Sequence, residues 1–278
     1  QGVIGRYYAL ASGESEAVAQ AIEGHYHPRF PGDTLPDTLP GLAVSVADRL
    51  DSLAGLFGVG IKPRSMSDPY GLRRDALGLL ANLVGQEVHF SLRRGLKAAA
   101  LHLPVKADDE ALDSAVEFVI RRFEVQLRDE GLRHDAISAV VATGLDDPYE
   151  MRRIAQAFTV LIGTDAWRDI LHAHSRCKRI VRDLDETFAL NPGVDPDPSS
   201  LALHEATEAA WQKMDASEDK LTTLLDVMAE LREPINAFFE AVLVMAKEPE
   251  LKTARLALVQ RIAALPNGIV DLSQFEGF

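Results

Sequence analysis

The sequence predicts an all-α protein. Apolar residues recur at steps of three and four in segment after segment, which is the spacing of one face of a helix. Glycines and prolines fall between these segments, where helices end and begin. No segment alternates convincingly between apolar and polar residues with the period of two that a half-buried strand requires.

The first 40 residues are expected to form two short helices and a loop. The helices share residues 1–24, with Gly13 between them. Four prolines follow within residues 24–40, and they indicate an ordered loop because proline cannot continue a helix.

Residues 41–85 carry two clear amphipathic helices around a loop. The first is expected to begin near Pro40, which suits a first helical turn, and to end at Gly58. The second is expected to open with Asp68 as its N-cap and to end at Gly85. The buried stripe of the first helix is Leu42, Val46, Leu50, Leu53 and Phe57.

The rest of the chain continues in the same pattern. One helix is expected to reach Leu103, and a second to run from the acidic residues 108–110 to Gly131. Shorter helices cover 135–142 and the segment after Asp147-Pro148. The expected elements after these are a helix from Thr164 or Asp165 to about Phe188, a loop over 191–200, and three or four helices broken at Pro234 and Pro249 and ended by Pro266.

The composition excludes several classes of protein. No apolar run approaches the 18 residues of a membrane span, and one cysteine excludes an internal disulfide. We therefore expect a cytoplasmic protein that has no signal peptide and does not bind membranes. The chain begins inside an apparent motif, so we expect it to be a piece of a longer protein. A net charge of −13 argues against general binding to DNA or RNA, and residues 186–240 alone contribute −9.

Two basic clusters stand out against this acidity. Residues 62–74 have a net charge of +3, from Lys62, Arg64, Arg73 and Arg74 against one aspartate. The second cluster, Arg176, Lys178, Arg179 and Arg182, lies within seven residues of one predicted helix. Its like charges repel, so either a polyanion such as RNA relieves them or they pair with Asp183, Asp185 and Glu186. The sequence leaves both interpretations open.

Other polar residues are weaker candidates. Arg255 lies opposite the apolar face of residues 234–262, together with Lys247, Lys252 and Arg261, and we expect that side to reach RNA. The doublets Arg121-Arg122 and Arg152-Arg153 are predicted to lie on solvated faces. Tyr7, Tyr8 and Tyr26 could stack on unpaired bases, although core or edge tyrosines are commoner.

No catalytic or metal-binding set is predicted. Residues two apart on a helix point about 200° apart, so His25 with His27, or His172 with His174, cannot face one ion. Cys177 could share a face with His174, but a structural zinc site needs four ligands. The other candidates are Asp48, expected to be a polar anchor beside buried Ala47 and Leu50, and His134-Asp135, expected to lie at a helix start with Asp135 as a cap.

Five stretches carry a resemblance to a known family. They are ADRLDSLAGLFGVG at 47–60, DPYGLRRDALG at 68–78, QGVIGRYYA at 1–9, HYHPRFPGD at 25–33 and PINAFFEAVLVMAKEPELKTARLALVQRI at 234–262. Over nearly its whole length the chain resembles the β subunit of the bacterial-type, heterotetrameric glycyl-tRNA synthetases. The basic stretch SRCKRIVRDL at 175–184 is similar to the helix that leads into the family's anticodon-binding domain.

The resemblance implies an architecture. It implies an N-terminally truncated HD-like helical domain over 1–104, connecting helices over 105–164, and a DALR-like anticodon-binding bundle over 165–278. HD-type metal phosphohydrolases order their ligands as His, His-Asp and a distant Asp. Here Asp48 matches only the last of these, and the His134-Asp135 pair follows it in the wrong order.

The resemblance also implies a function. The chain would bind the anticodon end of tRNA(Gly) and support ATP-dependent glycylation, as part of a ligase whose α subunit or fused α segment performs the chemistry. The fragment itself would hold no cofactor, since ATP and Mg²⁺ belong to the α part. The alternatives are an HD-type metal-dependent phosphohydrolase and a helical scaffold that assembles subunits.

Overall fold

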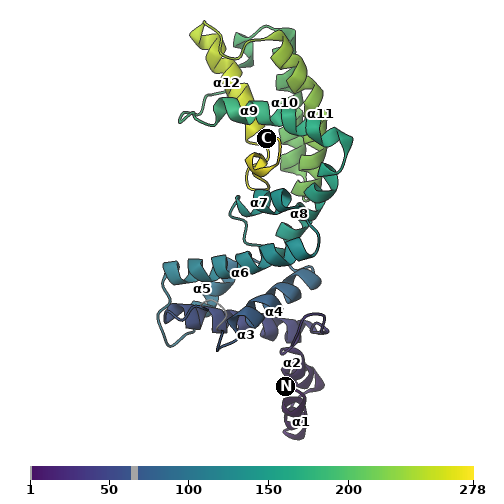
Figure 1. Ribbon diagram of the computed structural model, residues 1–278, viewed down its shortest axis with the longest axis vertical. Helices are drawn as coiled ribbons and strands as arrows, with labels where there is room; N and C mark the ends of the chain where they lie inside the picture. Colours follow the sequence, from purple (N-terminus) through teal and green to yellow (C-terminus); the bar gives the residue numbers. More distant parts are fainter. Residues whose placement is uncertain (1, 64–67) are drawn as a thin grey trace. The chain divides into compact units, whose positions relative to one another are not determined.

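All regular secondary structure in the described part of the chain is helical. The computed structural model describes residues 2–63 and 68–278, and every element among them is an α-helix or a short 3₁₀-helix (Figure 1). The all-α prediction is therefore confirmed. The chain divides into two compact units: unit 1 comprises Gln1–Gly131 and Asp146–Arg153, and unit 2 comprises Leu132–Leu145 and Ile154–Phe278.

Unit 1 is built around one central helix. Its elements are α1 (Val3–Ala11), α2 (Glu16–Gly24), α3 (Leu39–Gly58), α4 (Leu72–Gly85), α5 (Leu92–Ala100) and α6 (Asp109–Asp129). Helix α3 packs against α2, α4, α5 and α6 (Figure 1). Leu53 of α3, Leu79 of α4 and Phe123 of α6 are completely buried between them. The predicted stripe of α3 is thus the core of the unit.

Side-chain caps set most helix starts in unit 1. The hydroxyl of Thr38 accepts a hydrogen bond from the backbone N–H of Gly41, with Pro40 in the first turn as predicted. The predicted acidic start of α6 is also confirmed, since the Asp108 carboxylate accepts from the N–H of Ala111. These bonds satisfy N–H groups that have no partner within the helix.

Helix α4 begins later than the sequence predicted. Its first residue is Leu72, and its N-cap is Gly71 at φ +74° instead of Asp68. Asp68 still stabilises the start of the helix, because its carboxylate accepts hydrogen bonds from the N–H groups of Leu72 and Arg73 at 2.9 and 2.8 Å. Glycine adopts the left-handed backbone conformation without steric cost, and this explains why the turn before the helix lies at Gly71.

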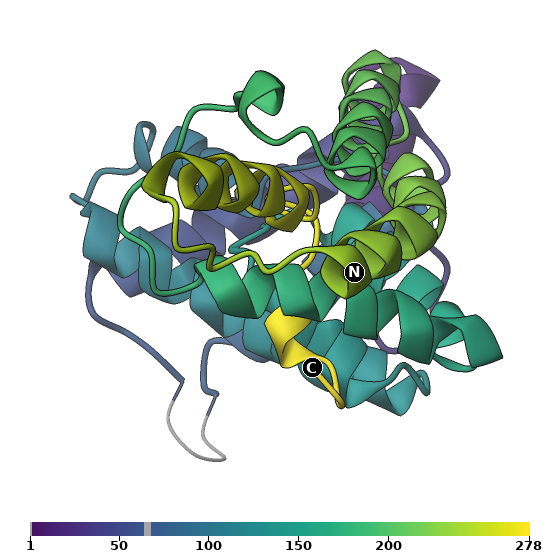
Figure 2. The ribbon, with the colours of Figure 1, turned by 90° about the horizontal axis from the view of Figure 1, so that it is seen from above.

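Unit 2 packs its helices in pairs. Its elements are α7 (His134–Val141), most of α8 (Pro148–Ile162), α9 (Asp165–Val181), η1 (Pro192–Val194), α10 (Pro198–Ala216), α11 (Lys220–Ala241), α12 (Pro249–Ala263) and η2 (Leu272–Gln274). Helix α10 pairs with α11, and α9 packs on both α11 and α12 (Figures 1 and 2).

Aromatic side chains fill the core of unit 2 near the C-terminal residues. The ring of Trp167 on α9 lies edge-on to Phe158 and to Phe275, with centroids 5.7 and 4.9 Å away. Trp211 on α10 donates its indole N–H to the carbonyl of Arg261, whose guanidinium lies 4.2 Å from the ring centroid. These contacts fix α9 to α8 and to the C-terminal residues, and α10 to α12.

Two predictions of helix boundaries in unit 2 were wrong. Helix α9 ends at Val181, not near Phe188, and the stretch after it has no buried apolar residue to hold another turn. Helix α11 continues through Pro234, where a break was expected. Leu231, Ile235 and Phe238 are buried on both sides of that proline, and their packing outweighs the one hydrogen bond that proline removes.

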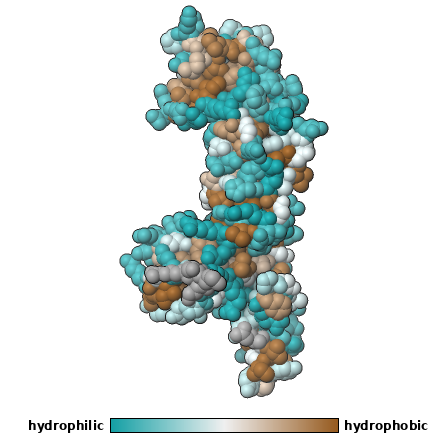
Figure 3. Space-filling view, in the orientation of Figure 1, coloured by the Kyte–Doolittle hydropathy of each residue, from teal (hydrophilic) through white to brown (hydrophobic). Residues whose placement is uncertain are grey.

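The surface mixes polar and apolar side chains. In the space-filling view, apolar residues reach the surface over α1 and over the loop at 242–248 (Figure 3). No helix in the described part of the chain is both long and apolar enough to span a membrane. The three domains implied by the family resemblance stay a prediction. The two compact units are defined by contacts within the structure, whereas the domains of a family are defined by common ancestry, so the units do not test them.

Candidate nucleic-acid interface

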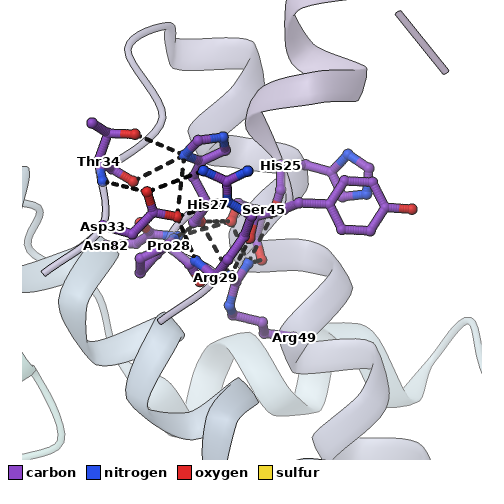
Figure 4. A network of polar contacts seen from close by, with 10 residues as sticks. His25, His27, Pro28, Arg29, Asp33, Thr34, Ser45, Arg49 and Asn82 are labelled. Atoms are coloured by element: carbon purple, nitrogen blue, oxygen red, sulfur yellow. Dashed lines mark hydrogen bonds and ion pairs between the residues drawn. The ribbon is translucent and has the colours of Figure 1, made fainter. Parts of the chain in front are cut away.

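A buried arginine organises the loop between α2 and α3 (Figure 4). The side chain of Arg49 on α3 is almost fully buried, and its guanidinium donates hydrogen bonds to backbone carbonyls only a few residues apart. Its Nη1 lies 3.1 Å from the oxygen of His25, and its Nη2 lies 3.1 and 3.3 Å from those of His27 and Pro28. Burial lowers the pKa of Arg49, which is the main effect on it. The carbonyls replace the water that this cation has lost.

Two neighbours complete this carbonyl cage. The Ser45 hydroxyl of α3 donates to the His27 carbonyl at 3.0 Å, and the Asn82 amide of α4 donates to the Ser45 oxygen at 2.8 Å (Figure 4). The stretch HYHPRFPGD therefore has a structural role here: its backbone oxygens hold a cation that ties it to α3 and α4.

The side chains of the same loop are also held locally. Arg29 donates from Nε to Asp33 at 2.8 Å, and these hydrogen bonds hold the pKa of the Asp33 carboxyl well below its usual range. Nδ1 of His27 lies 2.9 Å from the hydroxyl of Thr34. The ring of His25 lies against that of Tyr26, tilted by 39° with centroids 4.0 Å apart. Both histidines are therefore held by contacts within the loop and do not converge on a shared metal position.

The polar anchor predicted on α3 was wrong in its identity. Asp48 and Ala47 are exposed, and the buried ionisable group of the helix is the adjacent Arg49. At the His134-Asp135 pair, His134 is exposed and Asp135 accepts two hydrogen bonds from the guanidinium of Arg133. The ion pair here is thus Arg133 with Asp135. The prediction of Asp135 as the cap was wrong, because the N-cap of α7 is Arg133.

The remaining candidates for metal or nucleophile chemistry are separated or inert. His172 is exposed and His174 is buried, as their spacing predicted. Burial raises the pKa of the Cys177 thiol to about 12, so it stays protonated near neutral pH and is no nucleophile. Among the described residues no group of three or more His, Cys, Asp or Glu could hold a metal ion. Nothing in this geometry favours the HD-type phosphohydrolase.

The first basic cluster, at 62–74, is only partly available. The Lys62 ammonium donates to the Ser114 hydroxyl at 2.9 Å. Arg64 lies outside the described residues. Arg73 is half-buried, and Arg74 is exposed beside it on α4. Arg74 is therefore the residue of this cluster that is best placed to meet a ligand from solvent.

The second basic cluster, at 176–182, splits into two groups. The guanidinium of Arg176 lies 4.1 Å from the ring centroid of Phe239 on α11, so it packs toward the helical bundle. Lys178 and Arg182 instead line one pocket, and the exposed Arg179 lies 5.2 Å from the ring centroid of Phe278. We call Lys178, Arg179 and Arg182 the α9 basic face.

The α9 basic face is little engaged by acids. Arg182 is 3.3 Å from Asp183, but both side chains are more than half exposed, and such pairs contribute little to stability. Over the described ranges 2–63 and 68–278, neither Lys178 nor Arg179 has a carboxylate within ion-pair distance. Of the two interpretations that the sequence left open, pairing with Asp183, Asp185 and Glu186 accounts for Arg182 alone.

Arg255 has a different environment from the one expected. Its Nε lies 2.7 Å from Asp195 and its Nη1 lies 2.8 Å from the carbonyl of Leu243. Its side chain is 11% exposed, and that of Asp195 is 7% exposed. The arginine thus ties α12 to the loop before α10, and we leave it out of the proposed interface.

One arginine doublet is also more engaged than predicted. The guanidinium of Arg122 lies over the ring of Phe118, 3.3 Å from its centroid, so this residue covers the core of unit 1. Arg121 is exposed and pairs with Glu117, one turn away on the same helix. The doublet is therefore not a uniformly solvated face.

The pocket beside the α9 basic face had no signal in the sequence. Its walls combine α9 with residues from the end of α7 and from 262–278. Asn267, Ser273 and Phe278 belong to it, and none stands in a recognisable motif. Tyr7, Tyr8 and Tyr26 are exposed on α1 and at the end of α2, so stacking on bases stays a prediction for them.

Comparison with known proteins places these features in a family. Residues 1–142 match the model of the glycyl-tRNA synthetase β subunit. This match covers half of the chain. The chain belongs to the glycyl-tRNA synthetase β-subunit family. Residues 170–269 of this family member match the DALR anticodon-binding domain model, and they include the α9 basic face.

Relatives of this family member match along its whole length. It is 38% identical to the glycine–tRNA ligase β subunit of Moorella thermoacetica, over 99% of this chain and 41% of the relative. It is 35% identical to the chloroplastic/mitochondrial glycine–tRNA ligase 2 of Arabidopsis thaliana, over 100% of this chain and 26% of the relative. The chain thus spans well under half the length of these curated relatives.

Proposed function

We propose that this chain is the tRNA-binding part of a glycine–tRNA ligase. It would hold the anticodon end of tRNA(Gly), while an α subunit or fused α segment uses ATP and Mg²⁺ to attach glycine. The chain itself would contribute no catalytic group and bind no cofactor. Its partners would be tRNA(Gly) and the α part of the enzyme.

The observation that carries the proposal is the α9 basic face. Lys178, Arg179 and Arg182 are cations on the last turns of one helix in an acidic chain, and acids neutralise them only weakly. A polyanion that binds there replaces condensed counterions and relieves the repulsion between the cations. The match to an anticodon-binding domain over the same helix supports RNA as that polyanion.

The proposal is tested by tRNA binding at several salt concentrations. We expect Lys178→Ala with Arg179→Ala to weaken binding of tRNA(Gly) by about 1–3 kcal/mol and to flatten the dependence of log Kd on log salt. A second pair, Arg73→Ala with Arg74→Ala, tests the cluster of unit 1 in the same way. Gel-shift titration of this 278-residue chain measures both effects.

A matched control lies on the same helix. Arg168 is exposed near the start of α9, away from the basic face, so Arg168→Ala removes one surface cation and should change binding less than twofold. Equal losses in all three variants would indicate that RNA follows diffuse charge. If the unaltered chain bound no tRNA at physiological salt, the proposal would fail and the scaffold alternative would be the better one.

A further inference from the structure

Unit 2 contains a pocket large enough for a small organic ligand. Its volume is about 550 Å³, within the range of about 300–1,000 Å³ in which small-molecule sites fall. Most of its lining comes from α9, from the end of α12 and from the residues after α12. The cavity lies beside the α9 basic face defined above.

The charged groups in the pocket favour an anion. Lys178 and Arg182 are i and i+4 on α9, so both side chains lie on one side of the helix. The acid in the wall, Asp271, is engaged elsewhere: its carboxylate accepts a hydrogen bond from the N–H of Ser273 at 3.0 Å, which caps η2. The balance of the charged groups that line the pocket is positive.

The uncharged groups favour a flat, polar ring. Phe278 lines the pocket and offers an aromatic surface, with the Arg179 guanidinium also beside the ring. Asn267 offers an amide, which both donates and accepts, and the amide has no hydrogen-bond partner within the described chain. Unpaired bases are bound by this combination of stacking surface and edge-reading amide.

A buried histidine lies in the wall of the same pocket. Nε2 of His174 lies 3.0 Å from the carbonyl of Met228, so it carries the proton and leaves Nδ1 as an acceptor. Burial lowers the pKa of His174 to about 4, so the ring is neutral near pH 7 and adds no charge. The cationic character of the pocket therefore comes from Lys178 and Arg182.

We propose that this pocket holds one unpaired nucleotide of the bound tRNA, with a phosphate at Lys178 and Arg182 and the base between Phe278 and Asn267. The inference rests on the proposed function and adds a specific site to it. Diffuse attraction to the α9 basic face would not require the pocket to be open, whereas an inserted nucleotide would.

The decisive variant fills the pocket and leaves its charges in place. Ser273 is exposed at the pocket wall, so Ser273→Trp adds a large side chain there without removing a cation. We expect a loss of at least tenfold in tRNA affinity. The matched control is Gln274→Trp, an equally exposed neighbour outside this pocket, which should stay within twofold of the unaltered chain.

A milder variant guards against misfolding. Asn267→Ala removes only the amide, and we expect it to lower affinity at least fivefold while the far-ultraviolet circular dichroism stays unchanged. A tRNA with 2-aminopurine at each unpaired anticodon-loop position in turn should show one position whose fluorescence changes on binding. That change should be lost in Ser273→Trp and kept in Gln274→Trp.

The outcomes separate the pocket from the proposed function. Wild-type affinity in both Ser273→Trp and Asn267→Ala, together with weak binding by the Lys178 and Arg179 variant, would overturn the nucleotide pocket and leave tRNA binding intact. Absence of any tRNA binding by the unaltered chain would overturn both. Equal losses in Ser273→Trp and Gln274→Trp would also overturn the pocket, because bulk anywhere on η2 would then suffice.

Discussion

Arg49 of unit 1 and the α9 basic face of unit 2 are cations in opposite circumstances. Arg49 has lost its water and is surrounded by carbonyl oxygens of the loop that follows α2. Lys178 and Arg179 lie at the surface or in a pocket wall, without an acid beside them in the described residues. The surroundings of a cation thus decide whether it stabilises the fold or is available to a ligand.

The local sequence does not indicate that Arg49 is the buried cation. Arg49 lies between Asp48 and Asp51, which is typical of an exposed ion-paired arginine, whereas the run of 176–182 contains no acid. The loop carbonyls that bind Arg49, those of His25, His27 and Pro28, are more than twenty residues away in the chain.

Removal of the buried cation should have the largest effect. Arg49→Met leaves several buried carbonyls without donors, and we expect it to lower the free energy of unfolding of unit 1 by about 3–5 kcal/mol. Denaturant titration followed by circular dichroism measures the change. Asp48→Asn is the neighbouring control, since this side chain is exposed, and it should change stability by less than about 0.5 kcal/mol. A small loss from Arg49→Met would show that the cage carries little energy.

The buried histidine should make unit 2 sensitive to acid. His174 is held neutral with a pKa of about 4, below the 6.5 expected in the unfolded chain. Between those pH values the unfolded state binds a proton at His174 and the folded state does not. The free energy of unfolding therefore decreases as the pH falls from 6.5 toward 4, by about 3 kcal/mol in all. Urea titrations across this pH range should show the decline. It should be much smaller in His174→Phe, and an unchanged decline would contradict the assignment.

A glycine should prove necessary where Arg49 passes α4. A Cβ on Gly78 would lie 2.5 Å from Nε of Arg49, and the carbonyl cage prevents the guanidinium from moving away. We expect Gly78→Ala to destabilise unit 1 by about 1–3 kcal/mol, measured by thermal unfolding. Gly24→Ala is the comparison, because the nearest heavy atom is 3.9 Å from its Cβ position. If both substitutions were neutral, Arg49 would be less fixed than its hydrogen bonds indicate.

The exposed cations should have the smallest effect on stability. Lys178→Ala with Arg179→Ala removes no buried hydrogen bond, and we expect the free energy of unfolding to change by less than about 0.5 kcal/mol. The same variant is expected to lose tRNA affinity. A large loss of stability would indicate that these residues, like Arg49, stabilise the fold, and would contradict the contrast between the two units.

The parts of the fold that depend on local chemistry were predictable from the sequence. The stripe on α3, the proline in its first turn and the acidic cap of α6 are properties of neighbouring residues, and the structure confirms them. Where a local sequence signal conflicts with tertiary packing, the packing determines the structure. Pro234 lies inside α11 because the residues around it are buried.

The site was less predictable, because it is assembled from distant parts of the chain. The cations of α9 are recognisable in the sequence as a basic run, but their contacts are not. Arg176, for example, packs on Phe239 of another helix. Arg255 and Arg122 look like surface cations until Asp195 and Phe118 are placed beside them. No property of the sequence near Asn267 or Phe278 indicates a pocket.

Both tryptophans of the chain, Trp167 and Trp211, are in unit 2. Their intrinsic fluorescence therefore reports the unfolding of unit 2 alone, whereas circular dichroism at 222 nm (a standard wavelength for helices, roughly where their signal is strongest) reports the helices of both units. If the units unfold at different denaturant concentrations, the two curves will not superimpose, and their separation measures the difference in stability without any label. Coincident curves would instead indicate that the two units unfold together.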